Sequence, residues 1–227
     1  MDSYLERKIA IDVVFCVDAT ESVTDSVAPG CSVLDLAKKK IISIYEDLSN
    51  AREKKGKSGI LQFRVRLIAF RDYLADGERA MLVSDFFQLP QQSAEFEACV
   101  NSIHADGGGD VPEDGLEALA YAIRSNWTTE GTFRRHIIVL WTDAAPHALG
   151  FGKDAQHYPK GMASDIEVLT EWWYAMGNRE KRLVLFAPDE SYWQYICDNW
   201  DLTWHVPLCA DHPLSDQGYE RILEALV

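Results

Sequence analysis

Short apolar runs alternate with helical patterns along this chain. The apolar runs cover residues 9–18, 63–72, 81–89, 136–143, 182–188 and 202–208. Most of them are short and rich in Val, Ile, Leu and Phe, which is typical of buried parallel strands. Because only a short polar turn joins 63–72 to 81–89, we expect the 81–89 strand to pair antiparallel at the sheet edge.

The segments between these runs show helical spacing of apolar residues. Residues 32–51 place apolar side chains on one face and Lys38, Lys39 and Lys40 on the other, which predicts an amphipathic helix covering the sheet. Further helices are expected at 94–103, 113–125, 166–176, 192–199 and 217–226. We therefore expect a single domain over residues 1–227 with a three-layer, Rossmann-like α/β fold. Its six-stranded sheet would be mostly parallel, with one antiparallel edge strand and helices on both faces.

Composition and charge narrow the functional classes. The 227 residues are 47% hydrophobic and 26% charged, as in folded globular proteins, and the formal net charge is −14. Nucleic acid and anionic lipid are unfavourable partners for so acidic a chain, because binding to them depends on clustered Lys and Arg. The five cysteines include no Cys-x-x-Cys pair, so we expect reduced thiols and a cytoplasmic location. Asp12 and Asp18 interrupt the first apolar stretch, which predicts neither a signal peptide nor a membrane span.

Three polar segments lie where predicted strands end, at residues 18–22, 107–113 and 142–147. Ligands of open parallel sheets bind at the carboxyl ends of the strands. Carboxylates and hydroxyls gathered there, without thiolates or an imidazole cluster, suit Mg²⁺ or another hard divalent cation. Asp18, Thr20 and Ser22 alternate along the chain, so in extended backbone their side chains would face the same ion.

These segments resemble the von Willebrand factor type A (vWA) domain and its metal-ion-dependent adhesion site (MIDAS). Asp18, Thr20 and Ser22 match the Asp-x-Ser/Thr-x-Ser motif at the end of the first strand. Residues 110–113, Asp-Val-Pro-Glu, and 142–144, Thr-Asp-Ala, are similar to the variant found in the integrin β subunit and in stand-alone intracellular relatives. The resemblance extends over about residues 9–226.

The resemblance implies a ligand set and a function. Thr20, Ser22 and Glu113 would bind Mg²⁺, Mn²⁺ or Ca²⁺ directly, and Asp18 and Asp143 would act through bound water. A protein partner would complete the coordination with an Asp or Glu. We accordingly expect a metal-dependent adhesion or scaffold module, not an enzyme, in an intracellular multi-protein assembly such as a bacterial stress or defence system.

Further residues receive accessory roles. Gly108 replaces an Asn that helps to build an adjacent cation site in the integrin pattern, so Asp110 is expected to orient its loop or a water, with direct metal binding as the alternative. Asp72 would either orient the metal site or cap a loop. His147 and Tyr158, in the loop region after the fourth predicted strand, are candidate partner contacts. By resemblance, the helix at 217–226 could shift on ligand binding.

Two other functions stay open. A Mg²⁺-dependent phosphohydrolase of the haloacid-dehalogenase type also has an Asp at the end of its first strand, and Gly109-Asp110-x-x-x-Asp114 imitates its later acidic motif. That enzyme needs a second carboxylate two residues after its nucleophile, where this chain has Thr20. The other alternative is a scaffold domain with a non-functional metal site.

Overall fold

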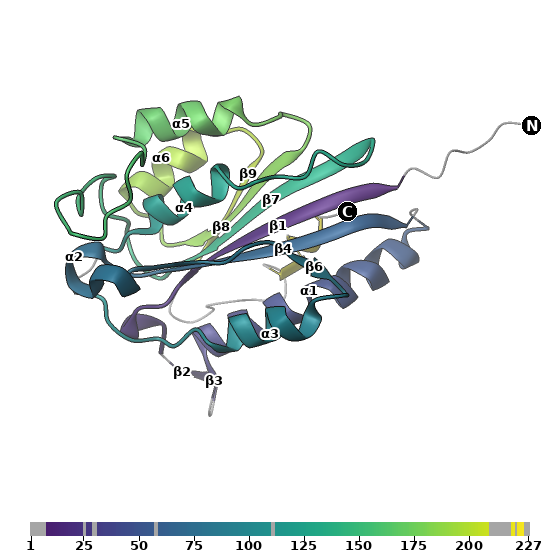
Figure 1. The fold of residues 1–227 in the computed structure, drawn as a ribbon, viewed down its shortest axis with the longest axis horizontal. Coiled ribbons are helices and arrows are strands. Elements are labelled where there is room, and N and C mark those ends of the chain that lie inside the picture. Colours follow the sequence, from purple (N-terminus) through teal and green to yellow (C-terminus); the bar gives the residue numbers. More distant parts are fainter. Residues whose placement is uncertain are drawn as a thin grey trace, which may run out of the picture.

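The computed structural model is an α/β fold with a mixed, mostly parallel sheet between two layers of helices (Figure 1). The structure describes residues 8–24, 26–28, 31–56, 59–109, 112–208, 219–220 and 222–224. Seven strands form the main sheet in the order β5-β4-β1-β7-β8-β9, with β6 also paired to β4. Their bounds are β1 Ile9–Asp18, β4 Ile60–Phe70, β5 Met81–Val83, β6 Phe87–Leu89, β7 Phe133–Trp141, β8 Lys181–Ala187 and β9 Thr203–Pro207.

The direction of the strands follows the sequence prediction. β4, β1, β7, β8 and β9 run parallel to one another, and β5 and β6 run antiparallel to β4. β1 lies in the centre, and all ten of its residues are buried. Its side chains alternate between two cores, with Phe15 and Val17 on one face and Val14 and Cys16 on the other. The apolar character of residues 9–18 therefore reflects burial on both faces of the sheet.

The predicted six-stranded sheet with one strand at 81–89 is wrong in one respect, because this segment forms two strands. β5 pairs with the end of β4 and β6 with its first half. Between them, Ser84 accepts a hydrogen bond from Leu67 N through its side-chain oxygen, at 2.9 Å. Arg66 Nε also donates to Ser84 O at 2.7 Å. The segment leaves the ladder after this point and rejoins it at Phe87.

Helices cover both faces of the sheet. α1 (Val33–Lys54) and α3 (Ser93–Asn101) lie on one face, and α4 (Gly115–Ile123), α5 (Ile166–Ala175) and α6 (Ser191–Asn199) lie on the other (Figure 1). The N-terminus of α1 is fixed by a capping box between Ser32 and Asp35. Residues 219–220 and 222–224 are helical, whereas the other residues of the predicted helix 217–226 lie outside the described residues.

Some short elements were not predicted. They are the helix α2 (Tyr73–Asp76), the 3₁₀ turns η1 (Glu21–Thr24) and η2 (Gly77–Arg79), and a separate ribbon of β2 (Ser26–Ala28) and β3 (Cys31–Ser32). None of the described helices has both the length and the apolar character needed to cross a membrane. The turns η1 and η2 and the helix α2 are local features that lie next to the carboxyl ends of β1 and β4, where the candidate site is found.

Candidate functional site

The carboxyl ends of β1 and β7 meet at Asp18. This buried side chain accepts hydrogen bonds from Thr20 N at 3.0 Å and Thr20 Oγ1 at 2.6 Å through its Oδ1 atom. Its Oδ2 atom accepts from Thr142 Oγ1 at 2.7 Å. Asp18 is therefore held on both carboxylate oxygens, by its own loop and by the residue that follows β7.

The same hydrogen-bonded network continues toward solvent. Thr20 Oγ1 lies 3.0 Å from Ser22 Oγ, and Ser22 Oγ donates to Asp143 Oδ1 at 2.9 Å. Ser22 and Asp143 are exposed, whereas Asp18 and Thr20 are buried. The structure thus joins four predicted ligands, Asp18, Thr20, Ser22 and Asp143, in one network that opens at the surface. Sequence reasoning gave no role to Thr142, although it directly precedes Asp143.

Glu113 enters the site from the loop before α4. Its backbone is fixed against the loop after β7, with Glu113 N donating to Ala145 O at 3.0 Å and His147 N donating to Glu113 O at 2.8 Å. The side chain is only 4% exposed, and its Oε2 atom has no hydrogen-bond partner among the described residues. A buried carboxylate oxygen without a donor is unfavourable, so this position favours a bound cation or a proton.

Gly108 lets Glu113 and Thr20 approach each other. Its φ of +82° lies in the left-handed region, and a Cβ atom there would lie 2.9 Å from Glu113 Oε1 and 3.2 Å from Thr20 Cβ. Both side chains therefore border the space that a larger residue at position 108 would fill. Asp110, in the same loop, lies outside the described residues.

Burial dominates the electrostatics of the site. It raises the pKa of Asp18 to about 6, although the hydrogen bonds from Thr142 and Thr20 act in the opposite direction. Burial and, as a smaller cause, the nearby charge of Asp18 together raise the pKa of Glu113 to about 9. No Lys or Arg of the described residues forms an ion pair with either carboxylate. Hard oxygen donors that have no cationic side chain paired with them in the described part of the chain fit a divalent cation such as Mg²⁺, Mn²⁺ or Ca²⁺.

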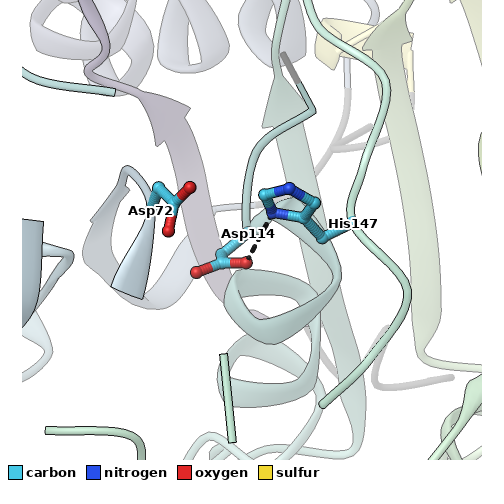
Figure 2. Close-up of side chains that lie close together, drawn as sticks. All are labelled: Asp72, Asp114 and His147. Atoms are coloured by element: carbon cyan, nitrogen blue, oxygen red, sulfur yellow. Dashed lines mark hydrogen bonds and ion pairs between the residues drawn. The ribbon is translucent and has the colours of Figure 1, made fainter. Parts of the chain in front are cut away.

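A second buried cluster lies beside this site and consists of Asp72, Asp114 and His147 (Figure 2). One potential ligand atom of each residue lies within 4.8 Å of the others. Asp114 Oδ1 is 3.1 Å from His147 Nδ1, and Asp114 Oδ2 accepts from Tyr73 N at 2.6 Å. Asp72 caps α2 by accepting from Leu74 N at 2.6 Å, which is the capping role considered for it.

The two predicted partner contacts lie mainly inside the protein. His147 is buried, and its ring stacks on Phe151 with the ring centres 4.0 Å apart. Tyr158 is half-buried and donates to Glu117 Oε1 at 2.8 Å. Through their contacts with Asp114 and Glu117, both residues connect the segment after β7 to α4 and its first turn. Sequence reasoning missed Glu117 and considered Asp114 only in a phosphohydrolase-like motif, because acidic residues near a helix start ordinarily face solvent.

This protein resembles known proteins in its fold but not in its sequence. No protein-family model and no curated protein matches the sequence. Among solved structures, the PilB minor pilin from Streptococcus sanguinis matches with a TM-score of 0.62 and 16% identity over 97% of this chain. The pilus adhesin SpaC from Lactobacillus rhamnosus GG matches with a TM-score of 0.55 and 13% identity over 95% of this chain. The chain spans 63% of the first protein and 30% of the second.

These findings correct the family assignment and the function drawn from it. The vWA and MIDAS resemblance is not supported by any family model, and the similar structures named above are pilus proteins. The intracellular scaffold, stress-system and phosphohydrolase interpretations are therefore withdrawn. Short acidic motifs at strand ends misled the assignment because polar loops recur there in many unrelated α/β sheets.

Proposed function

We propose that this protein is a non-enzymatic, structural or adhesive component of a pilus-type assembly. The observation that supports this class is the similarity of fold to a minor pilin over 97% of the chain. The similarity to a pilus adhesin over 95% of the chain points the same way. Because the chain spans only part of either protein, we propose the role of one module of such an assembly. Display at the cell surface replaces, in this proposal, the cytoplasmic location expected from the cysteines.

The binding centre we propose is a divalent cation at the carboxyl edge of the sheet. Thr20, Ser22 and Glu113 would bind it directly, and Asp18 and Asp143 would hold it through water. The observation that supports a cation is the buried Glu113 carboxylate, whose Oε2 atom has no donor among the residues that the structure describes and which lies next to a second buried acid. The exposed side chains of Ser22 and Asp143 leave this centre open to solvent.

The bound cation would supply a positive charge for an acidic side chain of a protein partner. The protein's own residues contribute the orientation, because the hydrogen bonds among Asp18, Thr20, Ser22 and Asp143 fix the open side of the centre. We propose neither nucleic acid nor a membrane as partner, in keeping with the net charge of −14. In this proposal the centre binds a protein partner and catalyses no reaction.

A Mn²⁺ titration followed by electron paramagnetic resonance tests the cation centre. Wild type should show one saturable site that Mg²⁺ displaces, and Glu113→Gln should bind at least about tenfold more weakly, since it removes a charged ligand. Glu78→Gln is the matched control, because Glu78 is exposed on η2 and carries the same charge. Thermal melting would show that all three proteins are folded. Equal binding by wild type and Glu113→Gln would contradict the proposed centre.

Immunogold labelling of the native cells tests the pilus class independently of the cation. Label on filaments at the surface of intact cells is the expected result. Label that appears only after the cells are made permeable would overturn the pilus-type role. It would leave the Mn²⁺ result unaffected, since the labelling does not depend on metal binding.

A further inference from the structure

A cleft of about 740 Å³ opens at the edge of the sheet opposite the candidate site. The first residues of β7, the end of α4 with its following loop, and the end of α5 with its following turn line this cleft. It lies where the parallel strands begin, and none of its lining residues belongs to the cation centre. Its volume is within the range of pockets that bind small ligands.

Two indole rings shape the cleft. Trp127 stacks on His136 with the ring centres 5.0 Å apart, and its Nε1 donates to Ile123 O at 3.0 Å, which fixes the plane of its ring. On the α5 side, the guanidinium of Arg124 lies over the ring of Trp172, with its Cζ atom 4.8 Å from the ring centre. Trp172 Nε1 has no protein acceptor in the part of the chain that the structure describes. The cleft therefore offers flat apolar surfaces next to unused hydrogen-bond donors.

The Arg124 guanidinium is fixed by two contacts and keeps N–H donors available for a ligand. One of its five N–H groups donates to Gly161 O at 3.0 Å, and its plane is supported by the Trp172 ring. Arg124 is exposed, and among the described residues it has no ion pair with a carboxylate. A guanidinium stacked on an aromatic ring keeps its in-plane donors free for an incoming carboxylate.

Positive charge accumulates along the cleft. A second hollow of about 260 Å³ shares Arg124 and Trp172 with the first and adds Arg66 and Lys160. Arg134 lines the first hollow, where it pairs with Glu180 at 3.3 Å. Among the described residues that line the two hollows, Glu180 is the one acidic side chain, against four Lys and Arg side chains. So basic a groove in a chain of net charge −14 favours an elongated anionic ligand.

We propose that this cleft binds an acidic oligosaccharide, a short chain of sugar rings that carry carboxylates. The apolar face of a sugar ring would pack on Trp127 or Trp172, and a carboxylate would bind the free donors of Arg124. Glu180 would accept hydrogen bonds from sugar hydroxyls. Glu180 also favours a sugar chain over single-stranded DNA, because a uronate ring carries free hydroxyls that can donate to this carboxylate and the internal sugars of DNA carry none. This proposal does not depend on the cation centre or on the pilus class.

Isothermal titration calorimetry with tetragalacturonate tests the proposal. Its fully methyl-esterified form and a dT tetramer serve as comparison ligands, and EDTA is present throughout to exclude binding through a divalent cation. Wild type should bind tetragalacturonate and should bind the ester at least about tenfold more weakly, since a charged hydrogen bond is lost. Arg124→Gln and Trp172→Ala should each weaken binding by about tenfold or more. Lys153→Gln, an equal change of charge at an exposed position outside the cleft, should bind like wild type.

Several outcomes would overturn the proposal. These are no heat of binding for tetragalacturonate at millimolar concentration, equal affinity for the ester, or wild-type affinity in both cleft variants. Binding of the dT tetramer in place of the uronate would identify a nucleic-acid groove instead. Arg124→Lys tests the guanidinium itself, because the substitution retains the positive charge but loses the planar group. It should bind more weakly than wild type at unchanged melting temperature.

Discussion

Thr142, directly after β7, donates a 2.7 Å hydrogen bond to Oδ2 of Asp18, the last residue of β1. Both side chains are buried, so this bond connects neighbouring parallel strands where solvent contributes little. It leaves the Asp18 carboxylate with protein donors on both oxygens. The orientation of Asp18 therefore depends on β7 as well as on its own loop.

Thr142→Val should destabilise the protein by about 1–3 kcal/mol. The substitution keeps the shape of the side chain but leaves Asp18 Oδ2 buried without this donor. Urea unfolding at neutral pH would measure the loss, with Thr129→Val as the exposed control. A free energy of unfolding equal to that of wild type would mean that Asp18 does not depend on Thr142.

Gly108→Ala should impair the candidate site as well as stability. A Cβ atom at this position would contact Glu113 Oε1 and Thr20, whereas a Cβ atom at Gly56 would meet nothing within 4 Å. Both glycines have positive φ, so Gly56→Ala reproduces the backbone cost of roughly 1 kcal/mol without the contact. We expect weaker Mn²⁺ binding in Gly108→Ala alone. Equal Mn²⁺ affinity in the two variants would argue against a site bordered by Gly108.

Glu117 should make stability depend on pH. Burial and, as a smaller cause, the charge of Asp114 together raise its pKa from an ordinary 4.5 to about 7. The folded state therefore holds the proton more firmly than the unfolded state, so the stabilisation is complete below pH 4.5 and is lost as pH rises through 7. Glu117→Gln should remove this loss, on the order of 1–3 kcal/mol, as measured by unfolding at pH 5 and pH 8.

The exposed Glu78→Gln serves as the control for Glu117→Gln. It should follow the pH profile of wild type across the same range. If Glu117→Gln also retains that profile, the proton is held elsewhere among the buried acids near α4.

His147→Ala should lower the free energy of unfolding by about 2–4 kcal/mol. The change removes the partner of Asp114 Oδ1 and leaves a fully buried carboxylate with Tyr73 N as its remaining donor among the described residues. It also empties the space against Phe151. His157→Ala, at an exposed position in the same segment, should lie within about 0.5 kcal/mol of wild type by urea unfolding. Similar free energies of unfolding for His147→Ala and His157→Ala would contradict a structural role for the buried pair of Asp114 and His147.

The main strands and helices were predictable from local pattern. Residues 9–18 form β1 as expected, because a strand buried on both faces is apolar throughout. The predicted helix at 32–51 corresponds to α1, Val33–Lys54. The division of 81–89 into β5 and β6 was not predictable, because it depends on the contact of Ser84 with Leu67 on another strand.

The candidate site was predictable where it depends on strand ends and not where it depends on helix packing. Asp18 and Asp143 follow neighbouring parallel strands, so their proximity follows from the sheet order. The pairing of Asp114 with His147 requires the start of α4 to pack against the loop after β7, which no local pattern encodes. The family assignment had the same weakness, since it relied on three short motifs at strand ends and not on the packing of the helices around them.

The two short strands beside β4 also affect the behaviour of the protein in concentrated solution. β6 occupies the backbone groups of β4 around Phe63–Val65, and β5 occupies those around Ile68–Phe70. Exposed strand edges are templates on which other chains pair and precipitate. The outer edges of β5 and β6 therefore form the border of the sheet on this side, and each of these strands is only three residues long. So short an edge offers an approaching chain few backbone groups to pair with, which disfavours amyloid-like growth from that side.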